Sequence, residues 1–172
     1  MNPAARECLL EFARSRHRRK RKKRDLLRCL GVVNGSDWAL AELKVAQQSK
    51  DSDAVEFSLM AAFIFGYTAE FLAPLTGLCL EDWHFSHENI VTMLGEIADP
   101  GTVGLLYRMT SWVPDYLDFD DSRALAHKAI HALGKIESPQ AVEALLDVRA
   151  TGPWLLRGVA DRRLQDKGLA DA

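Results

Sequence analysis

The sequence predicts an all-α protein built as a solenoid of stacked helix pairs. The main observation is an internal repeat, because residues 93–106 recur as residues 132–145 with six identical or similar positions at a constant spacing of 39. In both copies a turn containing proline separates two apolar helical stripes, and no long stretch of the chain has strand-like alternation. A repeated unit of this kind is typical of solenoids, since each unit buries its apolar side against the next.

The turn inside the repeat has the residues that a helix start requires. Ser138 precedes Pro139, as Asp99 precedes Pro100 in the other copy. A serine or aspartate cap followed by proline at the first helical position favours a new helix. Gly134, just before this turn, is small enough to allow close approach of another helix.

Apolar periodicity predicts the other elements in order. Helices are expected over residues 3–13, 37–48, 54–65, 70–80, 86–97, 102–112, 122–136, 141–149 and 154–164. Residues 25–33 overlay residues 128–136, so the basic run before them is expected to begin a further helix. The residues expected to be buried where helix pairs meet are Leu94, Ile97, Leu106, Ile130, Leu133, Ile136, Leu145 and Leu146.

We expect one domain over residues 1–172. It consists of a basic N-terminal helical segment at residues 1–30 and further helices, of which residues 86–168 form the clearest repeats. The stripe at residues 125–130 recurs 30 residues later, at 155–160. The spacing of 39 is therefore a unit of about thirty residues plus an acidic insertion.

Three features bear on location. Residues 57–80 are apolar enough to span a bilayer, but Gly66 fits a turn and Glu70 would lie near the bilayer centre, so we expect a buried helical hairpin and no membrane association. No secretory signal is apparent at the N-terminus. The cysteines, Cys8, Cys29 and Cys79, form no CxxC pair and no even set, which predicts reduced thiols in a cytoplasmic protein.

Charge is distributed unevenly along the chain. The net charge is −2, yet residues 1–30 hold eleven Lys and Arg against three acids, while residues 31–172 hold eleven against twenty-one. This uneven distribution indicates the kind of binding partner better than the net charge of the whole chain does.

The repeat resembles a known family. The pattern Ala-Leu-Gly-x-Ile-x-Ser-Pro-x-Ala-Val-x-x-Leu-Leu, at residues 132–146, resembles HEAT repeats in the short bacterial form of phycobilisome-lyase-like proteins. The resemblance implies a right-handed HEAT-like solenoid of about five helix pairs in a bacterial protein. It also implies an adaptor, or an immunity protein that neutralises a toxin, with the second helices lining a concave face.

The histidines do not make a convincing metal site. HEAT-repeat di-iron hydroxylases use four His-Glu pairs on successive helices, whereas here only His87 and Glu88 form such a pair. We therefore expect His84, His87, His127 and His131 to be surface or capping residues, with no metal and no cofactor. The aspartates of residues 115–121 lack the glycine and terminal glutamate of a calcium loop. No catalytic motif is present, so we expect no enzyme.

The predicted partner surface combines two neighbouring second helices with the acidic insertion. A basic protein partner, such as a toxin or nuclease, would suit the negative charge, and aromatic residues in the insertion would anchor it. The residues concerned are Glu88, Thr92, Glu96, Asp115, Tyr116, Asp118, Phe119, Asp120, Asp121, Arg123, His127, His131 and Lys135.

The alternative is a nucleic-acid-binding protein that uses the basic N-terminal helix. Lys and Arg side chains neutralise phosphates and make binding depend on salt. The acidic remainder of the chain argues against a long nucleic-acid track. The candidate residues are Arg18, Arg19, Lys20, Arg21, Lys22, Lys23 and Arg24.

Overall fold

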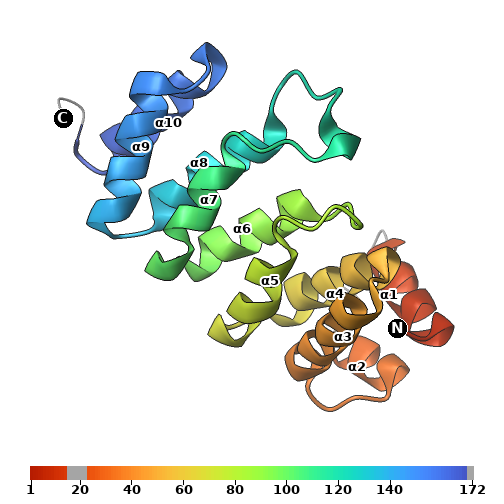
Figure 1. The fold of residues 1–172 in the computed structure, drawn as a ribbon. Coiled ribbons are helices and arrows are strands. Elements are labelled where there is room, and N and C mark those ends of the chain that lie inside the picture. The colour runs from red at the N-terminus through yellow and green to blue at the C-terminus, as the bar shows by residue number, and fades with distance from the viewer. Residues whose placement is uncertain (15–22, 170–172) are drawn as a thin grey trace. The chain divides into compact units, whose positions relative to one another are not determined.

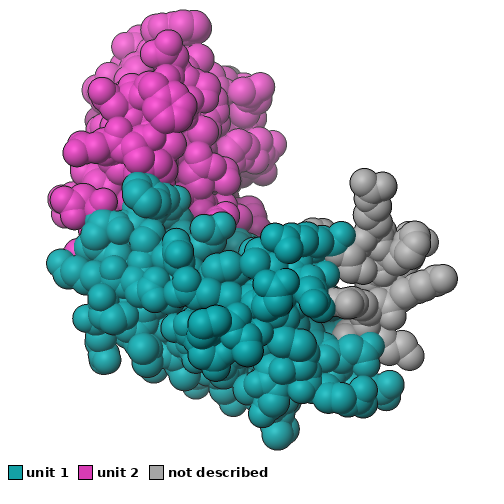
Figure 2. Space-filling model, turned by 90° about the vertical axis from the view of Figure 1, so that its right-hand side faces the viewer, with its two compact units in different colours: residues 1–74, 83–86 teal, residues 75–82, 87–172 magenta. Residues whose placement is uncertain are grey.

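The computed structural model describes residues 1–14 and 23–169, and these residues form helices without any strand (Figure 1). They divide into two compact units, residues 1–74 with 83–86 and residues 75–82 with 87–172, a division that the repeat pattern did not predict (Figure 2). The α-helices are α1 (Pro3–Arg14), α2 (Lys23–Leu30), α3 (Gly35–Ser49), α4 (Ser52–Phe65), α5 (Leu72–Leu78), α6 (His87–Ile97), α7 (Val103–Met109), α8 (Ala124–Lys135), α9 (Pro139–Thr151) and α10 (Trp154–Asp166). Short 3-10 helices are η1 (Ala69–Phe71), η2 (Pro100–Thr102) and η3 (Asp115–Leu117).

In the first unit α3 packs on α4, and α1 packs on both α2 and α4. The Asn34 side chain caps α3 by accepting hydrogen bonds from the Ser36 and Asp37 amides. Asp51 caps α4 through the Ala54 amide at 2.9 Å, and its other oxygen accepts from Arg6 of α1 at 2.9 Å. One carboxylate thus caps the N-terminus of α4 and links this helix to α1.

A disulfide joins α1 to α2 through Cys8 and Cys29, whose Cα atoms are 6.1 Å apart. The prediction of three reduced cysteines is therefore wrong for this pair. No sequence pattern predicted this bond, because the two residues lie 21 positions apart and the pairing of α1 with α2 brings them together. Since structural disulfides are typical of oxidising compartments, the cysteines no longer argue for the cytoplasm.

The apolar stretch at residues 57–80 is broken where the sequence predicted. Helix α4 ends at Phe65, and Gly66 follows with φ at 105°, a conformation that residues with a side chain rarely adopt. The chain then continues as η1 and α5. No helix in the described ranges has the length and apolar character needed to cross a membrane.

In the second unit α8 lies between α6 and α10, while α9 contacts α7, α8 and α10 (Figure 1). Gly95 allows α6 to approach α8, because a Cβ atom there would lie 2.9 Å from the Ala132 Cα atom. The predicted caps are confirmed: Asp99 accepts from the Gly101 amide and Ser138 from the Ala141 amide.

Most of the predicted core is buried in this unit. The buried residues are Leu94, Leu106, Ile130, Leu133, Ile136 and Leu145. Ile97 and Leu146 are only half-buried, which corrects the prediction for them. Ile97 is the last residue of α6, and Leu146 follows the buried Leu145, from which it is rotated by about 100° around the helix axis.

Candidate functional site

The acidic insertion between α7 and α8 is held in place by His87. This ring, at the start of α6, is fully buried. Its Nδ1 atom lies 3.0 Å from the Tyr116 hydroxyl, and its Nε2 atom lies 2.8 Å from the Glu81 carbonyl oxygen. A carbonyl can only accept, so Nε2 donates, and in the neutral ring Nδ1 accepts from the hydroxyl. His87 therefore ties the insertion to the turn before α6.

Aromatic contacts reinforce this attachment. The His87 ring stacks on Tyr116 with centroids 5.5 Å apart and meets the edge of Trp112 at 5.0 Å. Burial raises the pKa of Tyr116, which keeps its hydroxyl protonated as a donor. Tyr116 thus positions the insertion, whereas the sequence predicted an anchor for a partner. His84 and His87 were predicted to be surface or capping residues, and the surface part is wrong for both, since they are fully buried. His84 does accept a hydrogen bond from the Ser86 amide, at 3.2 Å, just before α6.

The attachment creates a hollow of about 360 Å³, here named the acidic pocket. Helix α7 ends at Met109, earlier than predicted, and Trp112 lies in the segment that follows it. One wall is this segment and the other is the turn before α6. The residues that line the pocket are Leu80, Glu81, Asp82, Trp112, Val113, Pro114 and Asp115. Three carboxylate side chains and one indole therefore share a single hollow.

The other residues of the insertion have different roles. Phe119 is 82% exposed, as an anchor would be, and Asp118 and Asp121 are exposed beside it. Asp120 instead caps α8, accepting from the Ala124 amide at 2.8 Å and from the amide and hydroxyl of Ser122. The Ser122 hydroxyl and then the Ala124 amide lower the pKa of Asp120, because they donate to its charged form. Asp120 thus holds the first turn of α8.

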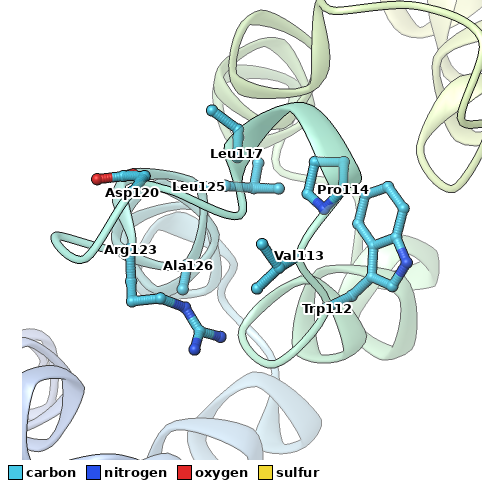
Figure 3. Close-up of a pocket in the computed structure, with 8 residues that line it drawn as sticks. All are labelled: Trp112, Val113, Pro114, Leu117, Asp120, Arg123, Leu125 and Ala126. Carbon is cyan, nitrogen blue, oxygen red and sulfur yellow. The ribbon is translucent and has the colours of Figure 1, made fainter.

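A second hollow nearby is a packing contact. Its volume is about 10 Å³, roughly one water molecule. Figure 3 shows Val113, Leu117 and Leu125 converging there, whereas the Asp120 carboxylate points away. Arg123 lies at its edge with φ at 55°, and its guanidinium donates to the Ser111 carbonyl at 3.2 Å. Arg123 therefore fastens the two ends of the insertion.

The predicted neighbours on α6 and α8 lie side by side. Glu88 pairs with Lys128 at 2.9 Å, and Glu96 pairs with Lys135. Thr92 lies between these pairs and donates to the Glu88 carbonyl at 2.7 Å. Because both glutamates are neutralised, this surface is less negative than the sequence suggested.

The predicted nucleic-acid residues fall mostly outside the described part of the chain. Arg18, Arg19, Lys20, Arg21 and Lys22 are not described. Lys23 and Arg24 are exposed in the first turn of α2. No contact of the described residues therefore tests this surface.

Sequence reasoning missed Glu81, Asp82 and Trp112. Nothing in their spacing links them, because contacts of His87 with Glu81, Trp112 and Tyr116 bring the two walls of the acidic pocket together in the fold. Burial raises the pKa of the Cys79 thiol to about 12, so it stays protonated. Within residues 1–14 and 23–169, no three His, Cys, Asp or Glu side chains are grouped to hold a metal ion.

Comparison with known proteins adds no relative. No protein-family model, curated protein or solved structure matches this chain. The resemblance to HEAT repeats therefore depends on the residues at 132–146 alone. The function has to be inferred from the geometry and charge of the site.

Proposed function

We propose that this chain is a non-enzymatic protein-binding module with a HEAT-like solenoid fold, which binds a basic protein partner at the acidic pocket. An immunity or adaptor protein is the sharpest form of this proposal. The observation that carries it is that Glu81, Asp82 and Asp115 line one hollow together with Trp112.

The chemistry of the pocket favours an arginine or lysine side chain. A guanidinium group forms strong paired hydrogen bonds with a carboxylate. It also stacks on an indole ring, a contact that contributes about 0.5–2 kcal/mol depending on exposure. Asp82 and Asp115 are exposed at the rim and Trp112 is half-buried, so an entering cation meets both kinds of group.

The surroundings favour the same class of partner. Residues 75–82 and 87–172 contain nine Lys and Arg against fifteen Asp and Glu, a net charge of −6. Such a field raises the association rate of a basic protein. Phe119 provides an exposed aromatic group on the same insertion, and aromatic side chains are enriched at binding hot spots.

The packing of the second unit supports the solenoid part of the proposal. Helices two positions apart in the chain contact one another: α6 with α8, α8 with α10, and α7 with α9. Stacked helix pairs produce this pattern, because the first helices form one row and the second helices another.

Replacing the pocket carboxylates should weaken the binding of basic peptides. We expect the triple variant Glu81→Gln, Asp82→Asn and Asp115→Asn to lose about tenfold in affinity, roughly 1.4 kcal/mol. The loss is expected because each amide removes a charged partner of the guanidinium. Fluorescence anisotropy with a labelled arginine-rich peptide measures this change.

A matched control has the same change of net charge. Glu56, Glu70 and Glu143 are exposed carboxylates outside the pocket, and changing all three to glutamine should alter affinity less than about twofold. Circular dichroism checks that both variants fold. Equal losses in the two variants would mean that only diffuse charge attracts the peptide, and the pocket would have no specific role.

The nucleic-acid reading remains a second candidate because of the charge of residues 1–30. Changing the seven Lys and Arg of residues 18–24 to glutamine should abolish binding of a single-stranded oligonucleotide and flatten its salt dependence, since each lost phosphate contact lowers the slope by about 0.7. The pocket variant should bind the oligonucleotide as well as the original or better. If the basic-run variant also stops binding the peptide while the pocket variant does not, the second candidate replaces the first.

A further inference from the structure

A hollow of about 240 Å³ lies between α6 and α8, on the surface where His131 is exposed. Its polar lining is almost entirely basic. The residues that line it are Val91, Thr92, Gly95, Lys128, His131, Ala132 and Lys135. Glu88 and Glu96 do not line it, although they pair with its two lysines. Each ammonium group has three donors, so one pairing leaves donors for a second acceptor.

Further cationic side chains surround His131. His127 and Lys135 lie one helical turn to either side on α8, and α10 contributes Arg162 and Arg163. Arg163 crosses α8 at Gly134, where a Cβ atom would lie 2.8 Å from the Arg163 Cδ atom. The absence of a side chain at Gly134 is therefore what gives Arg163 its position. The pKa of His131 is lowered, and burial is the largest cause. The nearby side chains of Arg163, His127, Arg162 and Lys135 lower it further, in that order.

Two buried nitrogen atoms beside this cluster lack a hydrogen-bond partner among the described residues. They are His127 Nε2 and Arg163 Nε. Arg163 does pair with Asp166 through its terminal nitrogen at 2.9 Å. Neither residue lines the hollow itself.

Three carboxylates near His131 form ion pairs with cations of this cluster. Glu88 and Glu96 on α6 pair with Lys128 and Lys135, and Asp166 on α10 pairs with Arg163. No ion pair of Arg162 occurs within the described residues. Helices α7 and α9 also pack on α8. Their charged groups do not affect the pKa of His131. These groups are Arg108 on α7 and Glu143, Asp147 and Arg149 on α9.

We propose that the hollow between α6 and α8 binds a compact oxyanion, a phosphate group, through Lys128, His131 and Lys135, while Arg162 and Arg163 of α10 add positive charge near His131. A phosphate accepts hydrogen bonds from several donors at once. A polyanion such as a nucleic acid does not suit the site, because the second unit carries a net charge of −6. The group is therefore free phosphate or a single phosphorylated side chain.

Binding is linked to the protonation of His131. An anion favours the charged imidazolium, so it raises the pKa of His131, which the neighbouring cations lower in the free protein. Affinity therefore increases as the pH falls through the pKa of this histidine. An anion that simply screened surface charge would shift all exposed histidines alike.

Histidine NMR signals test the proposal. Sulfate is the first probe because its charge is constant between about pH 5 and 8, and sodium chloride at equal ionic strength is the reference. We expect a saturable shift of the His131 signal, identified by its loss in His131→Gln, and a rise in the His131 pKa of about 0.5–1 unit. Inorganic phosphate should give the same response.

Variants separate a specific site from general attraction. Arg162→Gln and Lys135→Gln should each weaken sulfate binding about fivefold or more, as loss of a charge-assisted donor does. Arg157→Gln, an exposed arginine on the same helix α10, should leave binding unchanged. No His131 response beyond that in chloride, or equal losses in Arg157→Gln and Arg162→Gln, would overturn the proposal.

The two sources of the phosphate group are distinguished by a phosphoserine peptide. Tighter binding of this peptide than of inorganic phosphate assigns the site to a phosphorylated partner, whereas equal affinity assigns it to free phosphate. Both results require the anion site. Because the acidic pocket is a separate hollow in the same unit, its triple variant should bind sulfate normally, so the two proposals fail independently.

Discussion

A Leu133→Ala substitution is expected to destabilise the second unit by about 2–5 kcal/mol. Leu133 is fully buried on α8, and α8 contacts α6, α7, α9 and α10. The truncation removes buried apolar surface and leaves a cavity, because helices fixed on several sides cannot move in to fill it. Urea unfolding followed by circular dichroism measures the change in the free energy of unfolding.

Leu146→Ala provides a matched control. It removes the same atoms from the same repeat, but Leu146 is only half-buried on α9, so less apolar surface is lost. The difference between the two variants isolates the effect of burial. If Leu133→Ala cost no more than Leu146→Ala, the packing of α8 at the centre of this unit would be wrong.

Removing the Cys8–Cys29 disulfide should cost about 3 kcal/mol in the first unit. The bond closes a loop with a sequence separation of 21, and a cross-link of that length restricts the unfolded chain by roughly this amount. The double variant Cys8→Ser and Cys29→Ser should therefore have a lower unfolding midpoint. Adding a reductant to the original protein should lower its midpoint by a similar amount.

Thiol counting gives an independent check on this bond. Under denaturing conditions without reductant, a thiol reagent should find one free cysteine, Cys79. The double variant should be insensitive to reductant, because its one remaining cysteine, Cys79, forms no disulfide that could be reduced. Three reactive thiols in the freshly purified protein would contradict the disulfide.

Local features of the fold were predictable because their causes lie within a few residues. The caps at Asn34, Asp99 and Ser138 each involve an amide two or three positions away. The helix break at Gly66 likewise depends on one residue that tolerates a positive φ. The repeat also located the close approach at Gly134, where Arg163 of α10 crosses, and most of the buried leucines, since periodicity fixes which side of a helix is apolar.

Residue roles in the acidic insertion were less predictable. The sequence does not distinguish the roles of Tyr116, Phe119 and Asp120, because all three belong to one loop of aromatic and acidic residues. Tyr116 contacts His87, Asp120 caps α8, and Phe119 is left 82% exposed. Only the direction of each side chain separates a positioning role from a binding role, and composition does not contain that direction.

The sequence by itself determined the all-helical class, the helix starts and turns, the internal repeat and the imbalance of charge. The tertiary structure alone decided which charges meet. It joined Cys8 to Cys29, placed the turn before α6 against Trp112 through His87, and set Arg163 beside His131. The physical reason is range: caps and periodicity act over a single helical turn, whereas a pocket requires residues distant in the chain to be brought together by packing.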